Sequence, residues 1–319
     1  MTPEIDEINY RLRPAKSIER KMMADLLQKV GYIKLIREYQ YIGFGSIFFS
    51  EFRLFHRRFG IEDMVNIEKL FEAKKRVEFN KPFDCIKVVM GHSQSALGAD
   101  EVNWEKPTIL WLDYTNELRR RMLHREFQKF FSDAEPGSVF FVTLNAQPPD
   151  TDELDEIESH KELLKNRFSK GTVPRDLDDN LEGPEYGKAF RRIILNKIEG
   201  EYLRDRNIAR AEEDELTFKQ FCNFIYKDTS LMMTLGGVLL TPEMEDDFEA
   251  ANFDDLDFFK SGEDQYRIGI PSVTFDETRV LEKSLPNSLS SCEAPVPDPE
   301  KERFQKVYRY FPRFTESEL

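Results

Sequence analysis

The chain contains few cysteines and few histidines. Its three cysteines, Cys85, Cys222 and Cys292, are far apart in the sequence, and its four histidines form no HxH or HExxH pattern. Scattered cysteines in odd number provide no disulfide framework and no CxxC metal pair. The sequence therefore predicts no metal site and a reducing compartment, which favours a cytoplasmic location.

Long apolar runs are also missing. No run approaches the roughly 20 residues that a helix needs to cross a bilayer, and residues 1–7 are polar and acidic, unlike a secretory signal peptide. There is no GxSxG elbow and no P-loop. We therefore expect no membrane association, and neither a serine hydrolase nor an NTPase is indicated.

Apolar residues are nevertheless abundant, and charge is unevenly distributed. Among 319 residues, 40% are hydrophobic and 27 are phenylalanine, which is enough for a substantial core. Residues 1–148 contain 23 lysines and arginines against 21 acidic residues, whereas the remainder contains 23 against 39. The acidic second half disfavours nucleic acid as a partner, although the same charge also serves solubility alone.

In the first half, short apolar segments alternate with amphipathic ones. The apolar segments are 39–43, 64–68, 84–90, 108–112 and 138–144, and the amphipathic segments are 16–30, 46–59, 71–79 and 117–131. Most of these apolar segments lack polar alternation, as do strands buried on both faces of a parallel sheet. The pattern predicts an α/β fold, with a doubly wound, mostly parallel sheet and helices on both faces, over residues 1–148.

The second half is less regular. We expect a helical excursion and a β-hairpin over residues 149–242, followed by an acidic C-terminal extension over residues 243–319. Within these regions the sequence predicts a helix over 187–210, two strands around a Gly236-Gly237 turn, a strand over 266–275, a linker over 285–299 and a helix over 300–310.

The candidate site residues are those that directly follow the predicted strands. In an open parallel sheet, ligands bind beyond the carboxyl ends of the strands. The small or polar residues at those positions are Gly43, Gly45 and Ser46, then Glu68, then Gly91, His92 and Ser93, then Asp113 and Tyr114.

Gly43 and Gly45 lack a Cβ and would let the backbone approach a ligand. Ser46 is a candidate cap for the next helix, whose free N–H groups would face an anion. Phe48 stands where the GxGxxG pattern requires its third glycine, which disfavours a pyrophosphate and hence NAD or FAD. A simple turn is the alternative explanation of the two glycines.

Three charged residues complete the candidate site. Glu68 ends the next strand, where a carboxylate accepts hydrogen bonds from ribose hydroxyls; a solvated side chain is the alternative. Asp113 follows the most apolar strand and could attract a sulfonium or take a proton from a nucleophile, or it could cap the following helix. Lys16 lies in a cation-rich stretch and could hold a ligand carboxylate, or it could belong to a solvated helix start.

These segments resemble a known family. YIGFGS, NIEK, MGHS and LDYTNE, between residues 41 and 117, look like the cofactor half of Rossmann-type (class I) S-adenosylmethionine-dependent methyltransferases. The RPAKSIER opening of residues 13–20 is similar to that of bacterial proteins described as O-methyltransferases. The predicted hairpin would supply the antiparallel strand pair that completes the sheet of that family.

The resemblance implies a role for each candidate residue. Gly43 and Gly45 would border the methionine part of the cofactor, Glu68 the ribose, and Gly91–Ser93 the adenine, while Asp113 and Tyr114 would face the methyl group. The glycine loop is thinner than is usual in the family, and no NPPY-type tetrad follows Leu112. The acceptor atom is therefore unassigned.

Two classes of function remain open. The first is a methyltransferase that uses S-adenosylmethionine and acts on a small molecule or protein in preference to nucleic acid. The second is a non-catalytic sensor or scaffold on the same fold. Another nucleotide-cofactor enzyme is a further alternative, because a fold does not determine a function.

Overall fold

The computed structural model describes residues 13–149, 159–168 and 171–312. An eight-stranded sheet forms its centre, in the order β3-β2-β1-β4-β5-β7-β6-β8. The strands are β1 (Gln40–Gly43), β2 (Asp63–Glu68), β3 (Ile86–Met90), β4 (Thr108–Asp113), β5 (Val139–Asn145), β6 (Thr217–Lys227), β7 (Leu231–Leu240) and β8 (Tyr266–Ile268). Strands β1 to β5 are parallel, β7 is antiparallel to both β5 and β6, and β8 is parallel to β6. The predicted doubly wound, mostly parallel α/β fold is confirmed.

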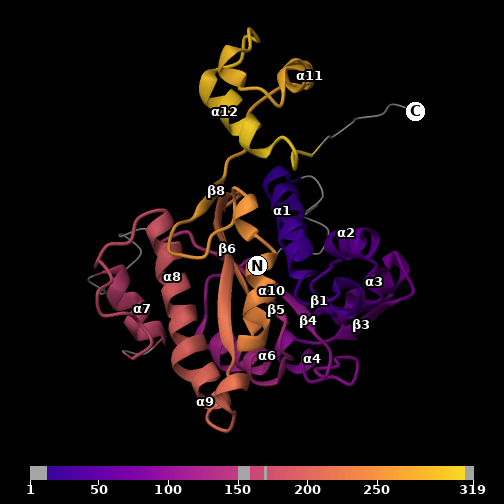
Figure 1. Cartoon of the computed structure of the whole chain (residues 1–319), viewed down its shortest axis with the longest axis vertical. Helices are drawn as coiled ribbons and strands as arrows, with labels where there is room; N and C mark the ends of the chain where they lie inside the picture. Colours follow the sequence, from indigo (N-terminus) through magenta and orange to yellow (C-terminus); the bar gives the residue numbers. More distant parts are fainter. Residues whose placement is uncertain (1–12, 150–158, 169–170, 313–319) are drawn as a thin grey trace.

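Helices lie on both sides of this sheet (Figure 1). On one side are α1 (Pro14–Val30), α2 (Ser50–Phe59) and α3 (Lys74–Asn80). On the other are α4 (Ser93–Ala96), α5 (Arg120–Met122), the π-helical turn η4 (Leu123–Phe127), α6 (Gln128–Asp133), α7 (His160–Phe168), α8 (Pro184–Lys197) and the π-helical turn η6 (Ile198–Leu203). Further along come α9 (Arg204–Asn207), α10 (Glu245–Ala250), α11 (Phe275–Ser284) and α12 (Asp298–Val307), and short 3-10 turns are found at Ile36–Glu38, Phe71–Ala73, Glu212–Asp214, Pro242–Met244, Phe253–Asp255 and Leu289–Ser291.

The sheet separates two apolar cores, which explains why the central strands lack polar alternation. Successive residues of a strand point to opposite faces. In β4, Trp111 packs in the core beneath α1 and α2, whereas Leu110 and Leu112 pack in the core beneath α6 and α8. Because helices cover both faces of the sheet, the side chains that point to either face must be apolar.

The predicted turn at Gly236-Gly237 is wrong. β7 runs straight through both glycines, and the hairpin turn lies between Lys227 and Leu231, where β6 ends and β7 begins. A Cβ on Gly236 would lie 2.2 Å from the ring of Phe141, and one on Gly237 would lie 2.5 Å from a backbone oxygen of β6. These glycines therefore make room for neighbouring strands rather than reverse the chain.

Ser46 does not cap the helix that follows it, contrary to the prediction. α2 begins at Ser50, and the loop before it holds Ser46 at φ 46° and Phe49 at φ 50°. The amide of Phe49 donates to the carbonyl of Gly45 at 2.7 Å, which closes a tight turn before the helix starts. Two non-glycine residues in the left-handed region mark this loop as strained.

The C-terminal residues form a small helical lobe that stands beyond β8 in Figure 1. The predicted linker 285–299 is instead part of this lobe, since Leu289, Ala294 and Val296 pack with Leu281 and Phe304 in a core of their own. The predicted strand 266–275 is also shorter than expected. β8 ends at Ile268, before Pro271, which lacks the N–H that a sheet ladder uses.

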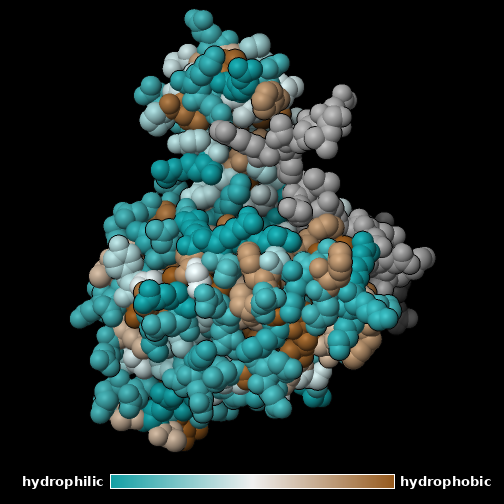
Figure 2. Space-filling view, turned by 90° about the vertical axis from the view of Figure 1, so that its right-hand side faces the viewer, coloured by the Kyte–Doolittle hydropathy of each residue, from teal (hydrophilic) through white to brown (hydrophobic). Residues whose placement is uncertain are grey.

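No helix in the described part of the chain is long and apolar enough to cross a membrane. Hydrophilic residues cover most of the face seen in Figure 2, and the hydrophobic residues on it are scattered in small groups.

Candidate functional site

The parallel register brings the predicted site positions to one edge of the sheet. Gly43, the last residue of β1, lies beside Asn66 of β2 and Trp111 of β4, and Glu68 lies beside Met90. The segments that follow β1, β2, β3 and β4 therefore all emerge at the carboxyl edge. A ligand would bind across this edge in a fold of this type.

The glycine loop after β1 is shaped by the packing of the protein itself. A Cβ on Gly43 would lie 2.4 Å from the hydroxyl of the buried Tyr41, and one on Gly45 would lie 2.8 Å from the ring of Phe52. The amide of Gly45 also donates to Oδ1 of Asn66 at 2.6 Å. Both glycines are thus required sterically, whether or not a ligand approaches them.

Glu68 is held at the end of β2 as the sequence predicts. Its Oε1 accepts the amide hydrogen of Leu70 at 2.9 Å, and its carbonyl accepts that of Gly91 at 2.8 Å. Burial raises the pKa of this carboxyl above its usual value. Gly91 adopts φ 149°, a conformation suited to glycine, and the exposed His92 precedes the first residue of α4.

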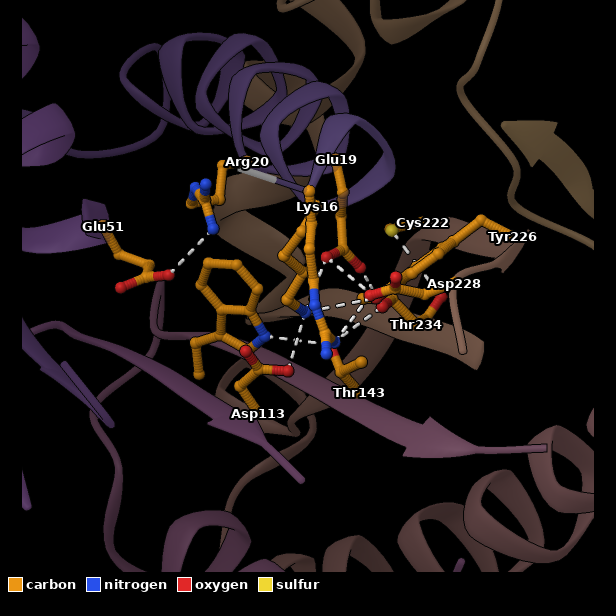
Figure 3. Close-up of polar contacts among 12 residues, drawn as sticks. Lys16, Glu19, Arg20, Glu51, Asp113, Thr143, Cys222, Tyr226, Asp228 and Thr234 are labelled. Atoms are coloured by element: carbon orange, nitrogen blue, oxygen red, sulfur yellow. Dashed lines mark hydrogen bonds and ion pairs between the residues drawn. The ribbon is translucent and has the colours of Figure 1, made fainter. Parts of the chain in front are cut away.

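Lys16 lies in a buried polar cluster between α1 and the sheet (Figure 3). Only 3% of this residue is exposed. Its Nζ is 2.7 Å from Oδ1 of Asp113 and 2.7 Å from Oε2 of Glu19, and it donates to the hydroxyl of Tyr226 at 3.2 Å. One ammonium group therefore bridges α1, the end of β4 and the end of β6.

Glu19 continues this network into the sheet. Its carboxylate accepts hydrogen bonds from the hydroxyls of Tyr226, at 3.2 Å, and Thr234. Thr234 is 2.8 Å from the hydroxyl of Thr143, which in turn accepts the indole N–H of Trp111 at 3.0 Å. We call Lys16, Glu19, Trp111, Asp113, Thr143, Tyr226 and Thr234 the Lys16 cluster.

The charges in this cluster compensate one another. Burial by itself would lower the pKa of Lys16, but the negative charges of Asp113 and Glu19 raise it well above its usual value. Burial raises the pKa of Glu19. Lys16 is therefore an ammonium ion at neutral pH, and Asp113, whose side chain is 19% exposed, is its partner at the surface.

Two further ion pairs extend from α1. Arg20 lies 3.4 Å from the buried Glu51 of α2, and Arg13 lies 2.8 Å from Asp228 in the turn between β6 and β7. The cation-rich opening of the chain therefore docks α1 on the carboxyl edge. The proposed contact of Lys16 with a ligand carboxylate stays a prediction, because both of its close anionic partners belong to the protein.

A pocket of about 250 Å³ opens on the other face of the same edge. Its lining residues are His92, Ser93, Gln94, Ser95, Arg121 and Glu126. We call it the Glu126 pocket. It joins the turn after β3, to which the family resemblance assigns the adenine, to the helix after β4.

Tyr114 contacts residues that line this pocket rather than those of the Lys16 cluster. The hydroxyls of Ser93 and Tyr114 both donate to Oε1 of Glu126, at 2.6 and 3.3 Å. Burial, followed by the charge of Glu126, raises the pKa of Tyr114, so its hydroxyl stays protonated. The two residues expected to face the methyl group, Asp113 and Tyr114, therefore send their polar groups to different clusters.

Glu19 and Glu126 were not predicted from the sequence. Glu126 lies four residues from Met122 and from Phe130, both of which are buried, so an acidic residue interrupts the apolar stripe of a helix. That interruption was a usable signal. In the described ranges, no group of three or more histidine, cysteine or acidic side chains is arranged to hold a metal ion.

The fold and the edge geometry define the class of protein. The order β3-β2-β1-β4-β5-β7-β6, with β7 antiparallel, is that of the Rossmann-type methyltransferases. Residues 8–319 match a family model described as "Putative O-methyltransferase". The chain belongs to this family.

The solved structures that this chain matches are distant from it in sequence. An O-methyltransferase family protein from Burkholderia thailandensis has 9% identity and a TM-score of 0.35, with 70% of this chain and 56% of that chain covered. Human N-acetylserotonin methyltransferase in complex with SAM has 8% identity and a TM-score of 0.34, with 72% and 56% covered. This chain thus spans little more than half of either protein. A comparison with curated proteins finds no match. The assignment therefore rests on the family match and the strand order.

Proposed function

We propose that the chain transfers the methyl group of S-adenosylmethionine to a nucleophile on a small molecule or a protein, in the cytoplasm. The observation that carries this proposal is the strand order with its antiparallel β7, in a chain that matches an O-methyltransferase family over residues 8–319. The residues at the carboxyl edge support it further.

The side chains at this edge fit the parts of such a cofactor. The carboxylate of Glu68 stands at the end of β2, where it would accept hydrogen bonds from the ribose. The turn at Gly91–Ser93 and the Glu126 pocket would take the base, and the loop of Gly43, Gly45 and Ser46 would border the methionine part. When bound, the cofactor supplies an electrophilic methyl group.

Asp113 is the group that we assign to the acceptor. Its carboxylate is partly exposed at the end of β4 and paired with Lys16 at 2.7 Å. That pairing fixes the direction of the carboxylate. Asp113 would orient the acceptor hydroxyl or amine and receive its proton, while the surrounding edge holds the reactants in line.

The acceptor is expected to bind against the acidic second half of the chain. The second half of the chain carries 39 acidic residues against 23 lysines and arginines. This charge opposes the approach of nucleic acid and favours neutral or cationic acceptors. Small molecules and proteins are therefore the first acceptors to test.

The experiment is a transfer assay with methyl-labelled S-adenosylmethionine and a cell extract that is separated into metabolite, protein and nucleic-acid fractions. We expect label in the metabolite or protein fraction. Asp113→Asn should lose at least about a hundredfold in rate and keep its affinity for the demethylated cofactor. Asp84→Asn, at an exposed position, is the matched control and should transfer at the wild-type rate.

Two results would contradict parts of this proposal. Unchanged transfer by Asp113→Asn would remove Asp113 from the reaction. Failure of the wild-type chain to bind the cofactor or to transfer label would favour the scaffold alternative.

A further inference from the structure

The helix α3 has an outer face on which apolar and basic side chains stand together in solvent. Phe71 and Phe79 are 66% and 88% exposed. The 3-10 turn Phe71–Ala73 leads directly into α3, so Phe71, Lys75 and Phe79 follow at intervals of four residues and share one side of the helix. Lys74 and Lys75 are exposed and make no ion pair within the described part of the chain. We call Phe71, Lys74, Lys75 and Phe79 the α3 face.

Two exposed phenylalanines on one side of a short helix indicate an interface. Leaving large apolar side chains in water costs free energy, and aromatic residues are enriched where proteins meet. The opposite side of this helix is already used, since Val77 is fully buried in the core beneath α1 and α2. The α3 face is therefore available to a partner outside this copy of the chain.

The helix α10 has a face of the opposite charge. Residues 243–257 contain eight aspartates and glutamates and no lysine or arginine. Four of these acidic residues are exposed and pair with no cation among the described residues: Glu243, Asp246, Asp247 and Glu249. We call these four residues the α10 face.

The two faces lie on the same side of the sheet and towards opposite ends of it. Phe248 of α10 packs against the same apolar core that contains Val77 of α3. In the strand order, α3 belongs to the crossover between β2 and β3 at one end. At the other end, Glu245 of α10 pairs with Lys219 of β6 at 3.1 Å. A two-fold axis parallel to the strands would therefore set the α3 face of one copy against the α10 face of another, and would do so twice.

Both helices also reach the same edge of the sheet. The chain enters α10 after the end of β7, which is antiparallel to β5, and it enters β3 after the end of α3. These points lie at the amino edge, away from the carboxyl edge that carries the candidate site. The two faces can therefore meet at one level, and the candidate site can stay open.

We propose that two copies of this chain pair through this side of the sheet, with the α3 face of each copy against the α10 face of the other. The lysines of one copy meet the carboxylates of its partner, and Phe71 and Phe79 leave the solvent. Because both contacts form under one two-fold axis, the assembly closes as a dimer. This inference does not depend on the proposed reaction.

The α10 face also disfavours other partners for the α3 face. Lysines beside exposed aromatic rings also suit single-stranded nucleic acid or an anionic bilayer. Either of these is an extended anion, and it would meet the acidic α10 face on the same side of the sheet and be repelled by it. A second copy, in contrast, offers the opposite charge to both faces.

Sedimentation velocity of the full chain tests this pairing. The wild-type chain should be a dimer at about 0.05 M salt and should dissociate as salt is added, because salt screens exposed charges. Lys74→Glu with Lys75→Glu should raise the dissociation constant of the dimer at least about tenfold, since like charges then face each other. Asp246→Lys with Asp247→Lys should do the same. Phe79→Ser, which leaves the charge unchanged, should also weaken the dimer at least about tenfold.

A charge swap shows whether these two faces meet each other. An equimolar mixture of the two charge-reversed variants should dimerise again, because each α3 face then finds an α10 face of opposite charge. A single chain that carries all four substitutions should dimerise as well. Arg119→Glu with Arg120→Glu is the matched control, since it reverses as much charge at exposed positions outside both faces, and it should leave the dimer unchanged.

Several results would overturn this inference. A folded wild-type chain that stays monomeric at about 100 μM in low salt would do so. Charge-reversed variants that dimerise like the wild type, or whose mixture stays monomeric, would do so too, and growth beyond the dimer would contradict the two-fold pairing. Binding of a single-stranded DNA oligonucleotide or of phosphatidylserine vesicles that is lost in Lys74→Glu with Lys75→Glu, without any dimer, would assign the α3 face to that partner instead.

Discussion

The two polar clusters at the carboxyl edge lie on opposite faces of the same sheet, and they differ in how completely their atoms are paired. In the Lys16 cluster every buried polar atom has a partner, and one ammonium serves two carboxylates. In the Glu126 pocket, the hydroxyls of Ser93 and Tyr114 both donate to Oε1 of Glu126. Among the described residues, Oε2 of the same carboxylate has no hydrogen-bond partner.

This difference separates a structural role from a binding role. A saturated buried network has nothing to gain from a ligand, but it fixes the geometry of any member that reaches the surface. In the Lys16 cluster that member is Asp113. An unsaturated network in a pocket, by contrast, gains stability when a ligand completes it. Lys16 therefore holds Asp113 in place, and its proposed contact with a ligand carboxylate stays a prediction.

The largest predicted effect is the loss of stability when the cation of the Lys16 cluster is removed. Lys16→Met should destabilise the protein by about 3–5 kcal/mol, because it leaves the buried carboxylate of Glu19 without a cation and removes the partner of Asp113. Urea unfolding of the purified chain measures this change. Lys16→Met combined with Glu19→Gln should recover part of the loss, since one buried charge is removed together with its partner.

Lys29→Met is the matched control in the same helix. Lys29 pairs at 3.1 Å with Asp255, whose side chain is 60% exposed, and surface pairs of this kind contribute at most about 1 kcal/mol. Equal losses for Lys16→Met and Lys29→Met would show that the Lys16 cluster is no tighter than a surface pair.

A smaller predicted effect is a loss of stability at high pH, caused by a tyrosine on the face of the sheet that carries the Glu126 pocket. Tyr186 is fully buried in the same core as Phe127, and burial raises its pKa to about 12. In the unfolded chain a tyrosine titrates near pH 10. Its stabilising contribution is therefore complete below about pH 10 and is lost as the pH rises towards 12.

Tyr186→Phe removes this dependence. Between pH 10 and pH 11 the wild-type chain should lose about 1 kcal/mol more of its unfolding free energy than the variant does. Urea unfolding at the two pH values measures the difference. Parallel losses in the two proteins would mean that Tyr186 titrates in the folded state as it does in the unfolded chain.

The sequence predicted the parallel half of the sheet because its strands are buried on both faces and are therefore continuously apolar. It did not predict β6, whose apolar pattern is interrupted by Gln220 and Asn223. These side chains donate to backbone oxygens between residues 260 and 264, at 2.7 to 3.1 Å. Because the hydrogen-bond partners of these polar residues lie about 40 positions away in the chain, the sequence around β6 does not reveal that it is a buried strand.

The candidate site was predicted as a set of positions but not as two clusters. Residues after parallel strands must share an edge, so Glu68, Gly91 and Asp113 could be grouped from the sequence. The partnership of Lys16 with Asp113 spans 97 residues and depends on where α1 docks. Likewise, Gly43 and Gly45 are required by Tyr41 and Phe52, contacts that only the packed structure provides.

Thermal unfolding with and without S-adenosylmethionine and S-adenosylhomocysteine tests the central claim most directly, with NAD and ATP as controls. At a hundred times its dissociation constant, a ligand that binds this edge should stabilise the folded chain by about 2.7 kcal/mol and raise its melting temperature. We predict stabilisation by the two S-adenosyl compounds alone. No shift with either of them, in protein shown to be folded, would contradict the account.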